Sequence, residues 1–581
     1  MSRRAIATAV LLLASCVSVE TRVSRMSLAE KVGQLFVVAG DARFSNERSP
    51  EWLRVRRLVE GRRVGGIIWY RSSVFAAAQL DQRLQQSAPT PLLVSCDLED
   101  GLGTRFDDAS LAPPAMAIAA TGDPDLAWRL GRSTAEQAHA LGIHQIYAPV
   151  ADVNVDPDNP VINVRSFGED PHDVARYVAA YCRGVEAGGA IATLKHFPGH
   201  GDTKIDSHRS LPVLDVDRQR LDRVELVPFR AGIAAGARSV MVAHVAVSAL
   251  DPRPAPILPP EKRGRAFAAD ARETQTKGTM PATCSAPMVE GLLRGELGFD
   301  GLVVTDAMNM GGLADHFEPG EGAVCAILAG VDQILVSPDP EAAIDAVVAA
   351  ASSGRIPVAR IDQSVGRVLR EKERLGLFAR RTETPSPAVV VDTPEHVALL
   401  EEIAARSLTL VREAPGALPL RKTATIVHVV VTDDVTPGPV AAFDRDLASR
   451  ASVIATAILD PRSTPAESAA AIETARKADC VVLSLVARAR SGSGVLALPE
   501  RGASAASAIV ALGKKVVAVS FGTPYLLREL PAIETYLAAY AATEPIQRNA
   551  AKALFGESPI GGRLPVSIPG LVPLGAGLRR G

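Results

Sequence analysis

Between residues 30 and 340, short apolar runs alternate with longer, Ala-rich amphipathic segments. A short apolar run bounded by polar residues predicts a buried strand, and an amphipathic segment predicts a helix that covers a sheet. Eight strands with helices between them predict a (β/α)8 barrel, with a doubly wound parallel sheet as the alternative. The eight runs lie at 34–38, 66–70, 92–96, 145–148, 192–195, 240–244, 302–305 and 333–337.

A Pro-rich stretch and further apolar runs follow the predicted barrel. The segment from Thr382 contains Pro385, Pro387 and Pro394, which is typical of a linker. Beyond it, strand-like runs separated by Ala-rich helical stretches predict an α/β sandwich domain. A chain of 581 residues also exceeds what one hydrophobic core usually supports. We predict a barrel domain over 24–380, a linker over 381–395 and a second domain over 396–571, with strands near 424–431, 480–486 and 515–521.

The first sixteen residues have the pattern of a secretory signal. Arg3 and Arg4 precede an apolar run over 5–13 that is too short to span a bilayer. The run ends in Leu13-Ala14-Ser15-Cys16, which resembles the bacterial lipobox, in which the cysteine is lipidated. We expect a lipoprotein-type signal over 1–16 and a lipid anchor at Cys16, with an ordinary cleaved signal as the alternative. Either reading makes this an exported protein, in the periplasm or anchored to a membrane.

The balance of acidic and basic residues indicates which class of partner the protein binds. The chain has 63 Lys and Arg and 65 Asp and Glu, a net charge of −2, with the two signs mixed throughout. Because no basic stripe is present, we expect no nucleic-acid partner, and a neutral small molecule or polysaccharide fits better. Beyond Cys16 the five cysteines lack metal-type CxxC spacing, so we expect them to be buried apolar residues. They are Cys96, Cys182, Cys284, Cys325 and Cys480.

Polar residues follow four of the predicted strands. Asp97, Asp152, His196 and Asp306 come just after the third, fourth, fifth and seventh apolar runs. Active sites of (β/α)8 barrels are built at the carboxyl ends of the strands, so we expect these side chains to converge there. Asp306 could be a nucleophile, a metal ligand or the N-cap of a following helix, and this convergence favours the nucleophile.

The densest polar segment is K-H-F-P-G-H-G-D-T-K-I-D-S-H-R-S-L-P, from Lys195 to Pro212. It opens at a predicted strand end and becomes a loop at Pro198, and its Asp206 and His208 can form a proton-transfer pair. Histidines and aspartates in one loop could instead bind zinc, or serve only as a hydrogen-bonded structural loop. The Pro-Gly break makes a shared helix face for His196 and His200 improbable, which weighs against the metal.

A second polar run, over 148–171, contains several carboxylates and amides together with Arg165. Carboxylates and amides accept hydrogen bonds from sugar hydroxyls, and Arg or Lys donates to them, so this lining fits a sugar. For Asp156 and Asp158, beside Pro157 and Pro160, turn formation is favoured over direct contact with a ligand.

Several motifs make the chain similar to glycoside hydrolase family 3, in its β-N-acetylhexosaminidase branch. They cover nearly all of 28–340, and G-G-R-L-P-V-S-I-P-G from Gly561 resembles the second domain of longer members. The motifs are L-A-E-K-V-G-Q-L-F from Leu28, D-N-P-V-I-N-V-R-S-F-G-E-D-P from Asp158, K-H-F-P-G-H-G-D-T from Lys195 with D-S-H following, V-M-V-A-H from Val240, P-A-T-C-S from Pro281, and G-L-L-R-G-E-L-G-F-D-G-L-V-V-T-D-A-M from Gly291.

The resemblance implies a role for each matching residue in a retaining, two-step hydrolysis. Asp306 is implied to be the nucleophile, and His208, paired with Asp206, the general acid/base on a mobile loop. The Asp-Ser-His sequence points to N-acetylglucosaminides, because β-glucosidases of the family commonly take their acid/base from the second domain. No metal or organic cofactor is implied. The residues implied to bind the terminal sugar are Asp97, Arg165, Lys195 and His196.

The chain departs from the family at one loop, since the usual D-x-E-G-G is Asp97-Leu98-Glu99-Asp100-Gly101 here. We expect an exo-β-N-acetylglucosaminidase acting on β-linked N-acetylglucosaminide oligosaccharides or peptidoglycan fragments. The alternatives are a β-glucosidase or β-xylosidase, an N-acetylglucosaminide phosphorylase, and a non-catalytic sugar-binding lipoprotein.

Overall fold

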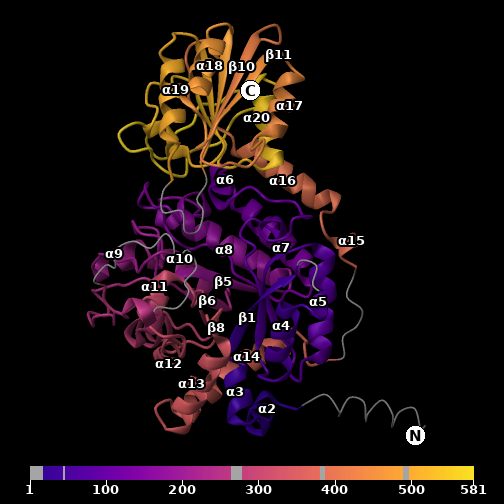
Figure 1. Cartoon of the computed structure of the whole chain (residues 1–581), viewed down its shortest axis with the longest axis vertical. Helices are drawn as coiled ribbons and strands as arrows, with labels where there is room; N and C mark the ends of the chain where they lie inside the picture. Colours follow the sequence, from indigo (N-terminus) through magenta and orange to yellow (C-terminus); the bar gives the residue numbers. More distant parts are fainter. Residues whose placement is uncertain (1–16, 43–45, 263–277, 380–385, 488–495) are drawn as a thin grey trace, which may run out of the picture.

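The computed structural model describes residues 17–42, 46–262, 278–379, 386–487 and 496–581. Figure 1 shows a barrel built from the first part of the chain and a smaller α/β domain, in orange and yellow, seated on one end of it. The predicted signal peptide and residues 381–385 of the predicted linker lie outside the described residues. The described part of that linker contains helix α15 (Pro387–Val390) and the start of α16 (Pro394–Ser407).

The first domain is a parallel eight-stranded barrel, which confirms the predicted fold. Neighbouring strands follow the order β7-β6-β5-β4-β3-β2-β1-β8. Pairing of β8 with β1 and a bond from the Thr305 N–H to the Gln333 carbonyl (3.0 Å) bring the ends of the sheet together. The strands are β1 (Phe36–Ala42), β2 (Gly66–Ser72), β3 (Leu93–Cys96), β4 (Gln145–Ile146), β5 (Ile191–Phe197), β6 (Ser239–Val242), β7 (Leu302–Thr305) and β8 (Ile334–Leu335).

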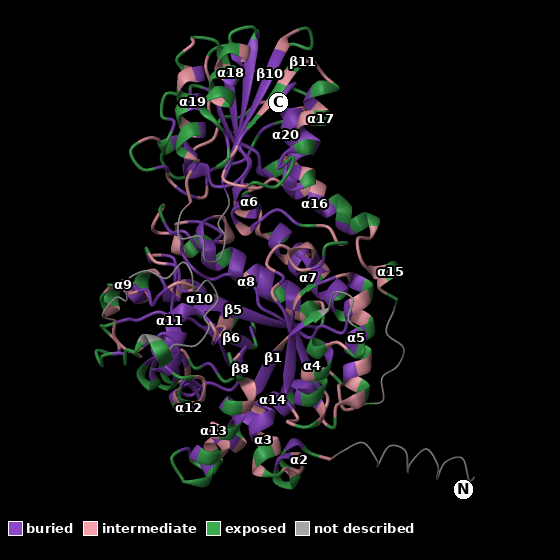
Figure 2. Cartoon of the chain, in the orientation of Figure 1, coloured by how far each residue is buried: buried purple, intermediate pink, exposed green. Residues whose placement is uncertain are grey.

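The helices that surround the barrel begin at capping residues. Ser27 and Glu30 form a capping box at α3, and Asp170 caps α8 just before Pro171, whose fixed φ suits the first helical turn. The buried strands and the exposed outer faces of the helices are visible in Figure 2. The helices are α2 (Val19–Arg25), α3 (Leu28–Gly33), α4 (Pro50–Glu60), α5 (Val74–Ser87), α6 (Ala115–Ala120), α7 (Pro124–Ala140), α8 (Pro171–Ala187), α9 (Arg218–Arg223), α10 (Leu226–Ala234), η6 (Pro287–Glu296), α11 (Gly311–Ala314), α12 (Pro319–Ala329), α13 (Pro340–Ser352) and α14 (Val358–Arg374).

The barrel interior is filled by side chains and forms the floor of any site above it. Tyr147, Met241 and Val304 are nearly or fully buried there and pack with apolar residues from the other strands. Burial of each such side chain contributes about 1.5–3 kcal/mol. The interior is therefore a packed core, and ligands are confined to the loops at its carboxyl end.

The second domain is one six-stranded sheet between helices, which confirms the predicted α/β domain. Its strand order is β11-β10-β12-β13-β14-β9, with only β9 antiparallel to its neighbour. The predicted runs became β10, β12 and β13. The elements are β9 (Thr409–Arg412), β10 (Thr425–Thr432), α17 (Ala441–Ala448), β11 (Ser452–Leu459), α18 (Pro465–Ala475), β12 (Cys480–Val486), α19 (Glu500–Val510), β13 (Lys515–Ser520), η7 (Pro524–Arg528), β14 (Tyr536–Ala538) and α20 (Glu544–Leu554).

The prediction missed β9, β11 and β14. Strand β9 has only two consecutive apolar residues, Leu410 and Val411, whereas β14 is a buried apolar run that the prediction did not include. Strand β11 is an edge strand on which alternate residues are exposed, among them Ile454 and Ile458, so its apolar residues do not mark a buried run.

Helix α6 of the barrel domain is buried in the core of the second domain. Its Met116, Ala117 and Ala120 pack with apolar residues from the second sheet and its helices. The Arg563 N–H also donates to the Ala120 carbonyl at 2.9 Å. The two domains therefore share one hydrophobic core at their contact.

The described cysteines are free, and four of the five are buried, as expected, whereas Cys325 is partly exposed. None of the helices within the described ranges is long and apolar enough to cross a bilayer.

Candidate active site

A narrow pocket lies at the carboxyl end of the barrel strands and brings the predicted site residues together. Asp97, Arg165, Lys195, His196, His208 and Asp306 all line it, and Asp206 binds His208 at its edge. They arrive from the ends of β3, β5 and β7 and from the loops after β4 and β5. The other lining residues are Ile68, Tyr70, Glu99, Arg105, Val161, His200, Ser207, Met241, Ala307, Met310 and Leu335.

Asp306 follows the last residue of β7 and is fixed by backbone bonds. Its N–H donates to the Val242 carbonyl at 2.9 Å, and its Oδ1 accepts from the Ala307 N–H at 2.7 Å. Burial alone would raise the pKa of Asp306, but the imidazoles of His196, His244 and His208 and the Ala307 N–H hold it below its ordinary value. Asp306 is therefore an anion at neutral pH. The next helix begins at Gly311 with Met310 at its N-cap position, so the helix-cap interpretation of Asp306 is wrong.

His208 is held by Asp206. Its Nδ1 lies 2.8 Å from Asp206 Oδ1, which also accepts the His208 backbone N–H at 2.9 Å. The Asp206 side chain is fully buried, whereas that of His208 is 20% exposed. A carboxylate at Nδ1 fixes the ring orientation and stabilises the protonated imidazole, so Nε2 can accept and return a proton.

The loop that carries His208 is anchored on both sides. The buried His200 contacts Thr203 Oγ1 at 2.6 Å and Ser207 Oγ at 2.9 Å, one residue before His208. Burial lowers the pKa of His200 to about 4, so the ring is neutral and can accept one of these bonds. On the other side, the N–H groups of Gly311 and Gly312 donate to the carbonyls of His208 and Ser207. The loop is thus tied to the segment that follows Asp306.

His196 is oriented by a fully buried carboxylate. Asp152 Oδ2 lies 2.7 Å from His196 Nδ1, and the two Asp152 oxygens also accept the backbone N–H groups of His196 and His200. Burial alone would raise the pKa of Asp152, but the nearby imidazoles and these bonds lower it. Close packing of the loop also requires Gly201, because a Cβ there would lie 1.7 Å from the Val153 carbonyl oxygen.

One wall of the pocket is a network of paired charges. Lys195 Nζ lies 3.0 Å from Asp97 Oδ1 and 2.5 Å from Glu99 Oε1. Arg165 forms a bidentate pair with Glu99, with both contacts at 2.8 Å, and Arg105 binds Asp97 at 2.6 Å. Burial would raise the pKa of Asp97, but Lys195 and Arg105 lower it to about 2. The network is therefore ionised and preorganised, as a binding site for hydroxyl groups requires.

Sequence reasoning did not single out Glu99, Arg105 or His244. Glu99 stands two residues after Asp97, on the same side of an extended backbone, which was a usable signal. His244 was the last residue of a predicted strand, whereas His196 followed one; the Nε2 of His244 contacts the Ala307 carbonyl at 3.1 Å, beside Asp306. Arg105 follows a single turn of helix (Leu102–Thr104) and gave no signal in the sequence.

Some of the aspartates in these loops form local contacts and do not line the pocket. The Asp158 N–H donates to Asp156 Oδ1 at 2.9 Å, as turn chemistry predicted. Asp202 points away from the pocket to pair with Arg220 at 3.0 Å. Across the part of the chain that the structure describes, no three His, Cys, Asp or Glu side chains are grouped so that they could hold a metal ion.

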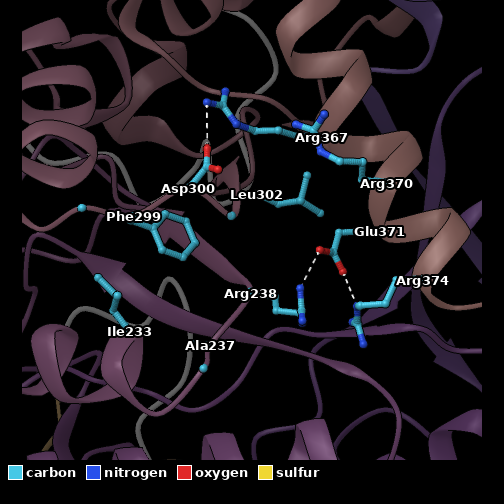
Figure 3. Close-up of a pocket in the computed structure, with 13 residues that line it drawn as sticks. Ile233, Ala237, Arg238, Phe299, Asp300, Leu302, Arg367, Arg370, Glu371 and Arg374 are labelled. Atoms are coloured by element: carbon cyan, nitrogen blue, oxygen red, sulfur yellow. Dashed lines mark hydrogen bonds and ion pairs between the residues drawn. The ribbon is translucent and has the colours of Figure 1, made fainter. Parts of the chain in front are cut away.

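Another cleft lies at the opposite, amino-terminal end of the barrel, where β6 and β7 begin (Figure 3). Arg238 and Arg374 bind Glu371 at 3.2 and 2.7 Å, and Arg367 binds Asp300 at 3.3 Å. These arginines pair with local carboxylates, as in a structural ion-pair network, and the predicted site residues lie elsewhere.

The chain matches known proteins along most of its length. A relative named β-N-acetylglucosaminidase/β-glucosidase, from Cellulomonas fimi, is 31% identical over 94% of this chain and 95% of its own. The solved structure of a family 3 β-N-acetylglucosaminidase from Paenibacillus sp. str. FPU-7 superimposes with a TM-score of 0.80 at 35% identity, covering 94% of this chain and 99% of the other. That of a β-glucoside phosphorylase bound to 2FGlc gives 0.83 at 26% identity, covering 95% and 96%.

Two family models cover both domains. Residues 27–371 match the glycosyl hydrolase family 3 N-terminal domain, and residues 386–573 match the family 3 C-terminal domain. The chain belongs to glycosyl hydrolase family 3.

Proposed function

We propose that this family 3 glycoside hydrolase releases terminal β-linked N-acetylglucosamine with retention of configuration. The observation that carries the proposal is the pocket in which the anionic Asp306 faces His208, an imidazole held by its own buried carboxylate. The names of the relatives from Cellulomonas and Paenibacillus support the choice of sugar.

The first step of the proposed reaction uses Asp306 and His208 together. Asp306 attacks the anomeric carbon from one face of the sugar, while protonated His208 gives its proton to the departing oxygen on the other. The C–O bond to the leaving group breaks, and a covalent sugar–Asp306 ester forms. Asp206 stabilises the imidazolium before this step and orients the neutral ring after it.

The second step reverses these roles. Neutral His208 takes a proton from water, the water oxygen attacks the anomeric carbon, and Asp306 leaves as a carboxylate. Because an imidazole can both give and take a proton near neutral pH, one side chain serves both steps. A neutral histidine also keeps a second anion away from Asp306, so the nucleophile stays ionised.

The sugar in this proposal is bound by Asp97, Arg165, Lys195 and His196. Support comes from the paired network of Asp97, Lys195 and Arg165, whose charges are set before a ligand arrives. Hydroxyl groups of a pyranose can donate to Asp97 and accept from Lys195, and His196 offers a further polar edge.

A phosphorylase is the second candidate, because the chain is similar to a solved β-glucoside phosphorylase. A neutral acid/base repels an incoming phosphate less than a carboxylate does. In that case, phosphate would replace water in the second step and yield a sugar phosphate.

Initial rates on p-nitrophenyl β-N-acetylglucosaminide and β-glucoside, with and without phosphate, test the proposal. We expect the first substrate to be preferred and phosphate to have no effect. Acceleration by phosphate with formation of a sugar phosphate would favour the phosphorylase, and preference for the glucoside would make the protein a β-glucosidase.

Two variants test the catalytic roles. Asp306→Ala should remove nearly all activity, whereas His208→Ala should lose much less on aryl glycosides with good leaving groups, which need little protonation. The matched control is His172→Ala, an exposed histidine on α8. Equal losses of His208→Ala on good and poor leaving groups would rule out His208 as the acid.

We also propose that the protein is exported and anchored through Cys16. The support is the Leu-Ala-Ser-Cys ending of the N-terminal apolar run. Radiolabelled palmitate should be incorporated into the full chain but not into Cys16→Ser, and only the variant should appear in the soluble fraction. Equal fractionation of the two would contradict the anchor.

A further inference from the structure

Two cysteines that are distant in the sequence contact each other in the barrel domain. Cys284 is the last residue of the short helix η5 (Ala282–Cys284), and Cys325 lies on α12, which packs against η5. Both are free thiols in the structure, and the thiol of Cys284 forms a hydrogen bond with the sulfur of Cys325. Contact between two thiols is the starting point for a disulfide bond, in which the sulfurs lie about 2.05 Å apart.

A charged pair beside Cys325 orients its sulfur. Cys325 donates to Glu321 Oε1 at 3.5 Å, and Arg355 binds the same carboxylate, with Nη1 2.8 Å from Oε2. Because the proton of Cys325 points to Glu321, the sulfur of Cys325 can accept the proton of Cys284. The two sulfurs therefore face each other.

The two thiols differ in exposure and in acidity. Cys284 is 6% exposed and belongs to the hydrophobic core, whereas Cys325 is partly exposed and packs against that core. The hydrogen bond between them raises the pKa of Cys284 and lowers the pKa of Cys325 below its ordinary value. Reactive cysteines are partly exposed thiols with a lowered pKa, and a second cysteine beside them completes the disulfide. Cys325 has the features of the attacking thiol, and Cys284 those of the resolving one.

A bond between these sulfurs would enclose the segment that carries the candidate nucleophile. Residues 285–324 contain β7, Asp306 and α11. The residue before Cys284 is Thr283, whose Oγ1 lies 2.8 Å from His244 Nδ1, and His244 in turn contacts the Ala307 carbonyl. A cross-link across a segment of this length restricts the unfolded chain and thereby stabilises the folded one.

We propose that Cys284 and Cys325 are a modification site, at which a disulfide oxidant converts the two thiols into a disulfide bond that stabilises the barrel around Asp306. The proposal does not depend on the reaction that the enzyme catalyses. It draws on the proposed export only for the source of the oxidant, because disulfides form and persist in oxidising compartments outside the cytosol.

The reaction is an exchange in two steps. The Cys325 thiolate attacks one sulfur of the oxidant, whose S–S bond breaks, so one thiolate leaves and a mixed disulfide remains on Cys325. Cys284 then gives its proton to the released thiolate, and its sulfur attacks that of Cys325. The second thiolate leaves as the new S–S bond forms and takes a proton from water. The protein loses two electrons and two protons in total, and the oxidant is reduced to two thiols.

The test uses the full chain, incubated with oxidised glutathione or with dithiothreitol. Peptide mapping should find the peptide of Cys284 joined to that of Cys325 after oxidation, with a mass two hydrogens below their sum, and the separate peptides after reduction. The oxidised protein should have a thermal midpoint about 3–6 °C above that of the reduced protein, as expected for a cross-link over a segment of this length.

Cys284→Ala and Cys325→Ala should each abolish both the joined peptide and the difference in midpoint. The matched control is Cys182→Ala, a buried cysteine on α8, which should keep both. Absence of the joined peptide from the oxidised parent protein, or a difference in midpoint that Cys284→Ala and Cys325→Ala retain, would overturn the proposal. Neither measurement uses a substrate, so this result and the fate of the proposed function are independent.

Discussion

Asp100 is the residue at which the chain departs from the family pattern, and its environment is unfavourable for a charge. Burial and the neighbouring Glu99 anion raise the pKa of Asp100 to about 7, from an ordinary 3.8. Between these two values, the folded protein keeps a proton that the unfolded chain releases. The free energy of unfolding that this proton contributes is therefore lost as pH rises from about 4 to 7. Above pH 7 the loss is complete.

Asp100→Asn should therefore stabilise the protein, because the amide resembles the protonated acid and cannot ionise. We expect a gain that grows between about pH 4 and 7 and levels off, at on the order of 4 kcal/mol. Urea unfolding at several pH values measures it, with the exposed Asp107→Asn as the control. A gain that does not vary with pH would show that Asp100 is not protonated in the folded state.

Single residues were predictable where the chain places them at a strand end. Asp97, His196 and Asp306 follow apolar runs, so the barrel itself brings them into one pocket. The roles of Arg105 and Glu99 were harder to predict, because Arg105 pairs with Asp97 and Glu99 pairs with Arg165. Such pairing is a tertiary contact and has no period along the sequence.

At the scale of elements, the loop that carries His208 is a small packed unit. His200 binds Thr203 and Ser207, and the N–H groups of Gly311 and Gly312 hold its far side. Sequence reasoning assigned no role to His200, since the Pro-Gly break weighed against a metal site with His196; in the structure His200 anchors the loop. Burial keeps this ring neutral, so one ring nitrogen donates to a hydroxyl oxygen and the other accepts from a hydroxyl.

His200→Gln should remove part of the acid sensitivity of the protein. The folded pKa of His200, about 4, lies below the unfolded value of 6.5, so its contribution is present above pH 6.5 and lost as pH falls toward 4. This loss is on the order of 3 kcal/mol. The variant will be less stable overall, so the measured quantity is the slope of unfolding free energy against pH between 4 and 6.5. We expect this slope to decrease by the amount that corresponds to one proton taken up on unfolding, relative both to the parent protein and to the control His172→Gln. An unchanged slope would contradict the anchor role.

Buried apolar runs, rather than strand length, decided which elements were predicted. All eight barrel strands and β10, β12 and β13 have apolar runs of at least three residues that are buried on both faces. The exposed edge strand β11 lacks this feature, and β9 has only two consecutive apolar residues, Leu410 and Val411. Strand β14 has such a buried run, Tyr536–Ala538, and was missed all the same.

At the scale of the whole molecule, the second domain supports the barrel loop that carries Arg165. Asn154 Nδ2 donates to the Tyr525 hydroxyl at 2.9 Å, and the Asn154 N–H donates to the Gly168 carbonyl at 2.8 Å, which closes the loop. The Glu169 side chain accepts from Ser567 of the second domain. This contact was not predictable, because the sequence of α6 and of this loop gives no sign of which core they join.

Tyr525→Phe tests whether that support reaches the candidate site. It leaves the buried Asn154 amide without its partner, at a cost of about 1–3 kcal/mol, and should loosen the loop on which Arg165 is held. Tyr536→Phe is the matched control, because its buried hydroxyl also forms one hydrogen bond, as a donor to the Pro524 carbonyl, but wholly within the second domain. Both variants should lower the thermal midpoint, whereas only Tyr525→Phe should lower kcat/KM on the N-acetylglucosaminide, by about three- to tenfold through KM. If the two variants lose stability equally and activity is unaffected in both, the domain contact stabilises the fold without positioning Arg165.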